Sequence, residues 1–486
     1  MVEAFPKTAN FRGFMEPVRV EADIHDLVIE GEIPPVLRNG SLYRLGPDAS
    51  YPPLLGDDVG FNGDGMMRMF RFGEDKVDFK SRYVRTERFE LEHAAGRALF
   101  GAYRNRYTAD PSVRDKDAGT ANTTPIWHGG KLLALKEDSL PVEVDPDTLE
   151  TLGRYDYDGK YTAAFCAAHP RFDPDTGDML FFGYNAKGDC TPDIAFYVAN
   201  PAGEIIKEEW IVAPYASMLH DFAITENYVI FPIMPTTTDL ARVQAGGDYW
   251  AWDGSKETHI GIMPRNGTAA DLRWFRGPAR WVYHFVNAYE RGNQIIIDAA
   301  VSDRNYAMFI KDMEGKAGSP EETNPEFRRW TIDMSPGSDS FEESVLVPGF
   351  ATLPIFDWRF STKKHRYAFA LSPTDPLAFR TKGSFMPPKT CVGRYDLDTG
   401  DFTRAQFPED SSLEEPCFVA RSPDAPEGDG YLLCVVDRFA ENRIDLVAID
   451  TADMEAGPVM TVKLPIRQRP AIHGAWISAD ARITQG

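Results

Sequence analysis

Short runs of apolar and aromatic residues alternate with turn-forming residues along most of the chain. Each run has the length of a β-strand, and long stretches with the 3.6-residue period of a helix are scarce. The pattern therefore predicts a protein built mainly from strands. The clearest runs are "NYVIFPIM" (227–234), "NQIIIDAAV" (293–301), "HRYAFALS" (365–372), "GYLLCVV" (430–436) and "IDLVAID" (444–450).

A turn motif recurs between such runs, as "DPDTL" at 145–149, "DPDTG" at 173–177 and "DLDTG" at 396–400. Because Asp, Pro and Gly favour tight turns, each motif predicts a hairpin. Hairpins repeated over this length favour a closed array such as a β-propeller, whose blades are roughly 40–50 residues long. The repeat is too irregular to count the blades. Segments 96–114 and 235–250 are expected to carry short helices or long loops that cap one face.

The composition sets limits on this picture. The chain has 486 residues, of which 43% are hydrophobic, and this is enough to bury a large core. The net charge is −22, so the surface repels phosphate backbones and anionic lipid, and we expect no nucleic-acid partner. The five cysteines are scattered and form no C-x-x-C pair, which disfavours a disulfide framework and a cysteine zinc site.

Targeting signals are not evident. The segment "MVEAFPKTANFRGFMEPVRV" lacks the apolar core of a signal peptide, and no run of about 18 apolar residues follows it. We therefore expect a cytoplasmic protein without stable membrane insertion.

Four of the nine histidines stand in or beside apolar, strand-like sequence: His169, His220, His284 and His473. They are too far apart for one helix or loop to gather them, whereas the inner strands of a propeller converge on one axis. Neutral imidazoles that meet at one point suit a divalent transition metal. Iron(II) with open positions is attractive because those positions can take O₂. The alternative for each histidine taken alone is an ordinary buried, hydrogen-bonded side chain.

These residues carry a resemblance to a known family. The chain resembles the carotenoid cleavage oxygenases, and within them the lignostilbene dioxygenases, nearly from end to end. The resemblance implies one domain over 1–486, an all-β seven-bladed β-propeller with a dome of loops and short helices over one face. It also implies one non-haem Fe(2+) per chain, held by His169, His220, His284 and His473, with His169 at the end of an inner strand. The motifs that carry it are "PPVLRNGSLYRLGPD" (34–48), "FNGDGMMRMF" (61–70), "HPRFDPDTGD" (169–178), "LHDFAIT" (219–225), "HFVNAYE" (284–290), "EEPCFVAR" (414–421) and "IHGAWI" (472–477).

The same resemblance implies glutamates that accept the other imidazole N–H of the metal-binding histidines. Glu137 in "LALKEDSLP" and Glu415 in "EEPCF" match this pattern. The family pattern implies a third glutamate, and the chain has Thr352 in "ATLPIFDWRF" at that position. Asp357, a water or a backbone carbonyl could take its place.

The motif "FGAYRNRYTADPSV" (100–113) resembles the lignostilbene branch. Tyr103 and Lys136 match residues that hold the 4-hydroxyl group of a stilbene there, and Phe61 matches one that packs on the substrate ring. A lysine beside a phenol favours the phenolate, which pushes electrons toward the vinyl carbon. Lys136 and Glu137 are neighbours, and neighbours on a strand face opposite sides. Both can meet one site only if the strand bends or ends there.

The leading hypothesis is an iron(II) dioxygenase that cleaves the central double bond of a 4-hydroxystilbene with O₂ to give two aromatic aldehydes. Isoeugenol or vinylphenol cleavage by the same chemistry is a close alternative, and apocarotenoid cleavage is a more distant one. A propeller scaffold that only binds partners is the alternative from a different class. The carotenoid branch should show an apolar membrane-docking patch, and "DYWAWDG" (248–254) keeps that reading open. The partner we expect is a small aromatic substrate, and a homodimer is the assembly considered.

Overall fold

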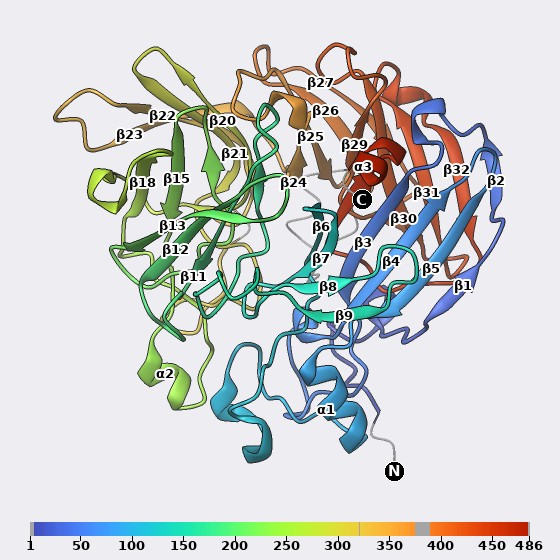
Figure 1. Cartoon of the computed structure of the whole chain (residues 1–486), viewed down its shortest axis with the longest axis horizontal. Helices are drawn as coiled ribbons and strands as arrows, with labels where there is room; N and C mark the ends of the chain where they lie inside the picture. The colour runs from blue at the N-terminus through green and yellow to red at the C-terminus, as the bar shows by residue number, and fades with distance from the viewer. Residues whose placement is uncertain (1–3, 320, 375–388, 485–486) are drawn as a thin grey trace.

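Seven antiparallel sheets stand side by side around a common centre, as a seven-bladed β-propeller (Figure 1). The computed structural model describes residues 4–319, 321–374 and 389–484. Within these ranges the regular structure is mostly strand, with three short α-helices. The predicted all-β propeller is confirmed.

Five blades are four-stranded sheets, each built from a continuous stretch of the chain. We number them 2 to 6. Blade 4 also encloses a separate two-stranded ribbon of β16 (Thr236–Thr237) and β17 (Ala251–Trp252). The strands are β6 (Thr124–His128), β7 (Lys131–Leu135), β8 (Val142–Val144) and β9 (Thr151–Arg154) in blade 2; β10 (Arg171–Phe172), β11 (Met179–Tyr184), β12 (Asp193–Ala199) and β13 (Ile205–Val212) in blade 3; β14 (Ala223–Ile224), β15 (Tyr228–Ile233), β18 (Thr258–Pro264) and β19 (Arg273–Gly277) in blade 4; β20 (Trp281–Arg291), β21 (Gln294–Ser302), β22 (Glu326–Asp333) and β23 (Phe341–Val347) in blade 5; and β24 (Thr352–Ile355), β25 (Tyr367–Ser372), β26 (Cys391–Asp396) and β27 (Phe402–Gln406) in blade 6.

The two remaining blades join strands from both ends of the chain, which closes the ring. In blade 1 the C-terminal strand β33 (His473–Ile477) pairs with β3 (Ser41–Pro47), so that Leu45 lies opposite His473. In blade 7 the N-terminal strand β2 (Val28–Gly31) pairs with β32 (Pro458–Leu464). The strands are β1 (Ala22–Ile24), β5 (Val77–Tyr83), β4 (Gly65–Phe72), β3 (Ser41–Pro47) and β33 (His473–Ile477) in blade 1, and β2 (Val28–Gly31), β32 (Pro458–Leu464), β31 (Arg443–Asp450), β30 (Gly430–Arg438), β28 (Ser411–Leu413) and β29 (Cys417–Ala420) in blade 7.

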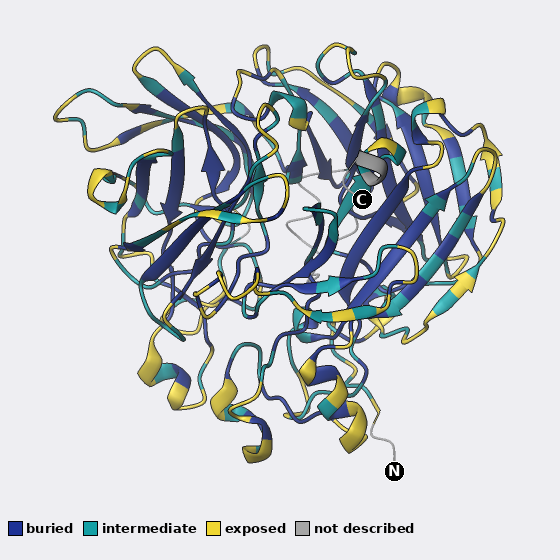
Figure 2. Cartoon of the chain, viewed as in Figure 1, coloured by how far each residue is buried: buried dark blue, intermediate teal, exposed yellow. Residues whose placement is uncertain are grey.

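The apolar core lies between blades. Leu42 and Phe70 of blade 1 pack with Leu433 and Leu446 of blade 7, and similar clusters join the other neighbouring blades. A middle strand is therefore covered on both faces, as the dark strands of Figure 2 show. This explains why strands such as β21 are apolar over nearly their whole length and do not alternate.

The recurring turn motif forms hairpins at all three predicted places. The first Asp of each motif, Asp145, Asp173 or Asp396, accepts hydrogen bonds from two backbone N–H groups that follow it. The fifth residue of the motif has positive φ: 76° at Gly177 and 62° at Leu149. Glycine adopts this conformation without the steric cost that leucine incurs.

Short helices and loops gather beside the blades. Helices α1 (Glu87–Ala95) and α2 (Leu240–Gln244) lie on the same side of the propeller in Figure 1, while α3 (Ala479–Thr484) follows β33. Helix α2 falls within the predicted segment 235–250. Segment 96–114 is a loop with two short 3₁₀ helices, as expected. Helix α1 ends just before this segment at Ala95, where Gly96 takes a left-handed φ of 67°.

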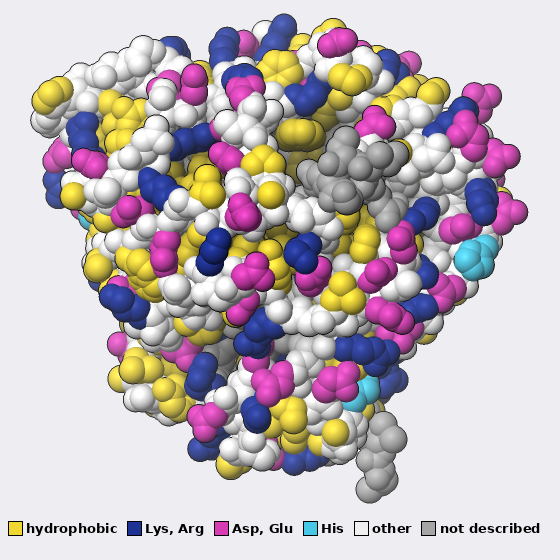
Figure 3. All heavy atoms as spheres, in the orientation of Figure 1, with side chains coloured by type: hydrophobic (Ala, Val, Ile, Leu, Met, Phe, Trp, Pro, Cys, Tyr) yellow, Lys and Arg dark blue, Asp and Glu magenta, His cyan; other side chains and the backbone are white. Residues whose placement is uncertain are grey.

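Two of the expectations about membrane contact can be compared with the structure. Among the described residues, no helix is both long and apolar enough to cross a bilayer. The aromatic side chains of 248–254 are buried, with Tyr249, Trp250 and Trp252 only 2%, 3% and 5% exposed, so this stretch is not an exposed patch. Acidic and basic side chains are interspersed over the face shown in Figure 3.

Candidate functional site

The four singled-out histidines lie on edge strands of four different blades, or just before them. His169 and His220 precede β10 and β14, His284 lies within β20, and His473 is the first residue of β33. His169 was expected at the end of an inner strand, but it lies two residues ahead of one. The register of β20 shifts around His284, which is a local bulge that re-aims a side chain.

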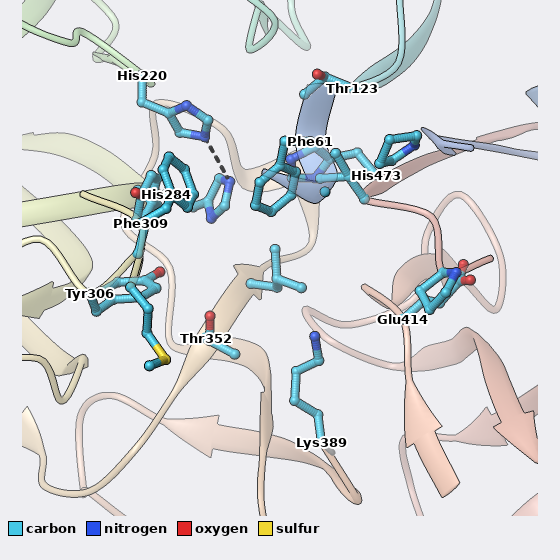
Figure 4. A pocket seen from close by; sticks show the side chains of 18 of the residues that line it. Phe61, Thr123, His220, His284, Tyr306, Phe309, Thr352, Lys389, Glu414 and His473 are labelled. Carbon is cyan, nitrogen blue, oxygen red and sulfur yellow. Dashed lines mark hydrogen bonds between the residues drawn. The ribbon is translucent and has the colours of Figure 1, made fainter. Parts of the chain in front are cut away.

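These four side chains converge on one point. One ligand atom from each, His169, His220, His284 and His473, lies within 4.8 Å of the ligand atoms of the others. The Nε2 atom of His220 is 3.1 Å from Nε2 of His169 and 3.3 Å from Nε2 of His284. Figure 4 shows the second of these contacts, and the ring centre of His473 lies 5.0 Å from that of His284. The four histidines therefore cluster in the structure, as the sequence predicted.

A buried carboxylate stands behind His220. Nδ1 of His220 lies against Oε1 of Glu137, whose Oε2 accepts a hydrogen bond of 2.8 Å from the Tyr184 hydroxyl. Arg104 donates to that hydroxyl at 2.7 Å and lies 3.8 Å from Glu137. Burial acts to raise the pKa of Glu137, but His220, Arg104 and Tyr184 outweigh it and lower that pKa to about 2. Glu137 is therefore ionised and can only accept, which fixes the proton of His220 on Nδ1.

A second carboxylate stands behind His473. Nδ1 of His473 is 2.8 Å from Oε1 of Glu415, and the other oxygen of Glu415 accepts from the backbone N–H of Gly474 at 3.2 Å. Arg44 donates to the Glu415 backbone carbonyl at 2.8 Å and its guanidinium lies 4.0 Å from the carboxylate. Both predicted glutamates therefore face the imidazoles from behind.

The third position differs, as the sequence indicated. Within the part of the chain that the structure describes, Nδ1 of His284 is buried without a hydrogen-bond partner. Asp357 does not replace the missing glutamate, because it binds Arg359 at 2.9 Å and the backbone N–H of Gly428 at 3.2 Å. Thr352 lines the same cavity as His284, and its hydroxyl bonds to Tyr306.

The donor set fits a metal ion. Burial, followed by the neighbouring imidazoles, lowers the pKa of His169 and of His284 well below the usual value, so both rings are neutral. Because the Nδ1 atoms of His220 and His473 face carboxylates, their Nε2 atoms present lone pairs to the shared centre. Converging lone pairs repel unless a cation lies between them. Neighbouring ligands at about 2.1 Å from a common ion would be roughly 3 Å apart, as the Nε2 atoms are.

A cavity of about 340 Å³ is lined by three of the four histidines, His220, His284 and His473. Its wall includes all three side chains that the sequence proposed for substrate binding, Phe61, Tyr103 and Lys136, together with Glu137. Strand β7 ends at Leu135, so Lys136 and Glu137 lie outside the strand and can both face one site. The strand thus ends before these two neighbours, which is what the sequence required for both to face one site.

Lys136 is 4% exposed and lies 5.2 Å from the Tyr103 ring centre. Its Nζ donates to the Phe61 carbonyl at 3.2 Å and to Oδ1 of Asn122 at 3.0 Å. Burial lowers the pKa of Lys136, against the opposing effect of Asp138 and Glu137, and burial raises the pKa of Tyr103 well above its usual value. Both groups are poised toward their neutral forms.

Several residues of the site had no signal in the sequence. Arg104 packs against four aromatic rings and supports Tyr184 behind Glu137. Asn122 holds Lys136, and the Phe309 ring lies 5.9 Å from that of Phe61. A lone Arg, Asn or Phe in a loop carries no spacing that would reveal such contacts; only the folded chain brings them together.

The sequence matches the family model described as retinal pigment epithelial membrane protein over residues 15–478. It is 45% identical to the isoeugenol monooxygenase of Pseudomonas nitroreducens, over 96% of this chain and 97% of that protein. It is 39% identical to lignostilbene-alpha,beta-dioxygenase isozyme III of Sphingomonas paucimobilis, over 98% of each chain. The crystal structure of Pseudomonas brassicacearum lignostilbene dioxygenase superposes with a TM-score of 0.93 at 38% identity, covering 98% of this chain and 100% of that one.

Proposed function

Because the chain belongs to the family of the retinal pigment epithelial membrane protein and the carotenoid cleavage oxygenases, we propose that it is an iron(II)-dependent dioxygenase for 4-hydroxystilbenes. The chain is an oxygenase of this family. The proposed reaction joins the two carbons of the central double bond to the two atoms of O₂, giving two aromatic aldehydes. Lys136 carries the proposal, because it places a buried amine on the cavity wall beside the four histidines.

His169, His220, His284 and His473 are the proposed ligands of one Fe(2+) per chain. Four imidazoles would leave positions on such an ion for another ligand, and iron(II) held there would supply the activation of O₂. The protein's own part is to hold the imidazoles in place. Glu137 and Glu415 keep the proton on Nδ1 of His220 and His473, so that Nε2 stays free to bind the metal.

Lys136 and Tyr103 are proposed to bind and ionise the phenol of the substrate. A neutral Lys136 has two N–H groups, which Phe61 and Asn122 accept, and one lone pair that is free to take the phenol proton. The resulting ammonium then donates its third N–H to the phenolate. Burial lowers the pKa of Lys136, so the neutral amine that accepts this proton costs less free energy to form than in an exposed lysine.

Apolar residues between these groups and the metal suit a conjugated aromatic substrate. Phe61, Phe309, Phe350 and Ile472 line the cavity, and they exclude water from the reacting double bond. We propose that Phe61 packs on the substrate ring, next to the lysine that its backbone carbonyl holds.

Isoeugenol or a vinylphenol is the second candidate substrate, because isoeugenol monooxygenases are 45% and 46% identical to this chain. Isoeugenol also has a free phenol conjugated to a double bond, so Lys136 and Tyr103 would serve both substrates alike. The two candidates differ in what lies beyond the double bond, which is a second ring in a stilbene and a methyl group in isoeugenol.

The test combines metal analysis with a small substrate panel. We expect about one iron per chain after anaerobic reconstitution, and kcat/KM to be highest for a 4-hydroxystilbene compared with isoeugenol and an apocarotenal. A higher kcat/KM for isoeugenol would transfer the assignment to the second candidate. A chain that retains no iron and cleaves none of the three would be a binding scaffold, and the proposal would fall.

A further inference from the structure

A second lysine faces the cavity from another part of the ring. Lys389 lies between blade 6 and blade 7, where its backbone N–H donates to Oγ of Ser412 at 3.3 Å and its carbonyl accepts from the N–H of Leu413 at 2.8 Å. Strand β28 therefore fixes the backbone from which the side chain extends. In Figure 4 the amino group points into the cavity from the side opposite Phe61.

The amino group of Lys389 differs from that of Lys136 in its partners. Lys136 is held by two protein oxygens at 3.2 Å and 3.0 Å. Among the residues that the structure describes, none forms a hydrogen bond or ion pair with Nζ of Lys389, which is half-buried on the cavity wall. Because an ammonium group has three N–H donors and this one faces the cavity, a group that enters the cavity can accept from it.

The nearby carboxylates do not neutralise this amine. Glu414 is occupied, because Arg44 and Arg68 each donate to it at 3.1 Å and the backbone N–H of Ala471 donates at 2.8 Å. Asp437 lies opposite Ser412 in the sheet and is 4% exposed. Burial raises the pKa of Asp437 well above its usual value, and the nearby Glu414 adds to this, so that Asp437 favours its neutral form. Burial lowers the pKa of Lys389, and the carboxyl groups of Asp437 and Glu414 oppose this effect. An anionic group that enters the cavity would favour the ammonium form of Lys389 further and accept a hydrogen bond from it.

We propose that Lys389 forms a second anchoring subsite, which binds an acidic group, a carboxylate or a phenolate, on the far ring of the substrate. This inference rests on the proposed function and specifies its substrate class. The cavity would then have two polar sites on its wall, Lys136 with Tyr103 and, separately, Lys389, together with His220, His284, His473 and the apolar side chains of Phe350, Leu353 and Ile472. A two-ringed substrate with polar groups at both ends reaches both lysines, whereas a propenyl side chain offers Lys389 nothing.

The experiment compares two substrates that differ only at the far end. One is a 4-hydroxystilbene with a 4′-carboxylate, and the other has a 4′-methyl group. For the iron(II)-loaded wild type, we expect kcat/KM to favour the carboxylate by about 10- to 100-fold, the usual range for one charge-assisted hydrogen bond. Lys389→Met should abolish this preference, mainly by raising KM for the carboxylate, and should leave kcat/KM for the methyl compound within about twofold of wild type.

Lys364→Met is the matched control, because Lys364 is exposed and pairs with Asp398 at 3.1 Å, so its loss should change neither substrate. A wild type without preference, a preference that survives Lys389→Met, or an equal loss on both substrates would overturn the subsite. Anaerobic binding of the two compounds to the iron(II) protein separates this result from the proposed function. If neither stilbene is cleaved, the function fails, yet a Kd ratio that depends on Lys389 still supports the subsite and a ratio of one refutes it.

Discussion

The two halves of the histidine cluster are built differently. His220 and His473 each turn Nδ1 toward a buried glutamate, and those glutamates are held in turn by Tyr184 and Gly474. On the other half, Nδ1 of His284 is buried without a described partner. We call the first pair the supported half and the part of the site around His284 the open half.

This difference shows which imidazoles the protein orients without help from a metal ion. A carboxylate that can only accept holds its imidazole in one tautomer and one orientation before any metal binds. His284 is positioned instead by the bulge in β20 and by packing. We therefore expect metal retention to depend on the glutamates of the supported half. We also expect that a new hydrogen-bond acceptor in the open half would increase metal retention.

Removing a ligand should have the largest effect in either half. His220→Ala and His284→Ala should each lose iron and all measurable stilbene cleavage, because three imidazoles remain at a site that needs four. The fold should survive, since the apolar cores between the blades do not include these side chains. Iron analysis, turnover and circular dichroism check this. Full iron occupancy with normal turnover in both variants would refute the ligand assignment.

Changing the supporting carboxylates should have a smaller effect. Glu137→Gln and Glu415→Gln put an amide behind His220 or His473, and an amide N–H can face Nδ1 and move the ring proton to Nε2. That tautomer cannot bind the metal. We expect iron affinity or turnover to fall by about 10- to 100-fold, measured as the rate of iron loss to a chelator and as kcat. Glu342→Gln, an exposed change in β23, is the control. Behaviour like the control would mean that the glutamates only pack.

Adding a carboxylate to the open half should have the smallest effect and the opposite sign. Thr352→Glu restores the residue that the family pattern implies, and it would give Nδ1 of His284 an acceptor from the same cavity wall. We expect iron loss to a chelator to slow by a few-fold. Thr352→Gln, with the same size and no charge, should slow it less. Faster iron loss in the glutamate variant than in wild type would contradict the idea that His284 lacks support.

The sequence was sufficient for the parts of the molecule that repeat or that carry rare residues. The "DPDTG" turns predicted hairpins because an Asp side chain caps the same backbone N–H groups in each copy. The four histidines were recognisable because a histidine beside apolar strand sequence is unusual. Resemblance to a family supplied Glu137 and Glu415, which otherwise look like surface carboxylates.

The remaining features arise only when blades come together. Nothing in the sequence near Arg104 shows that it will support Tyr184 from a neighbouring loop. Asp357 seemed a reasonable substitute for the missing glutamate because it is close to Thr352 in sequence. Its carboxylate, however, accepts hydrogen bonds from Arg359 and from the backbone N–H of Gly428. The sequence around Lys389 does not show that this side chain faces the cavity, because residues of several blades form the cavity wall.

The central claim is that a buried lysine ionises the phenol of the substrate, and one comparison tests it most directly. The measurement is kcat/KM of the iron(II) enzyme for 4-hydroxystilbene and for its 4-methyl ether, with wild type and Lys136→Met. A methyl ether has no proton to give to Lys136, so wild type should cleave it about 10- to 100-fold more slowly, a loss that corresponds to roughly 1.5–3 kcal/mol. Lys136→Met should keep its iron and cleave the free phenol about as slowly as wild type cleaves the ether. Equal cleavage of the two stilbenes by wild type would contradict the account.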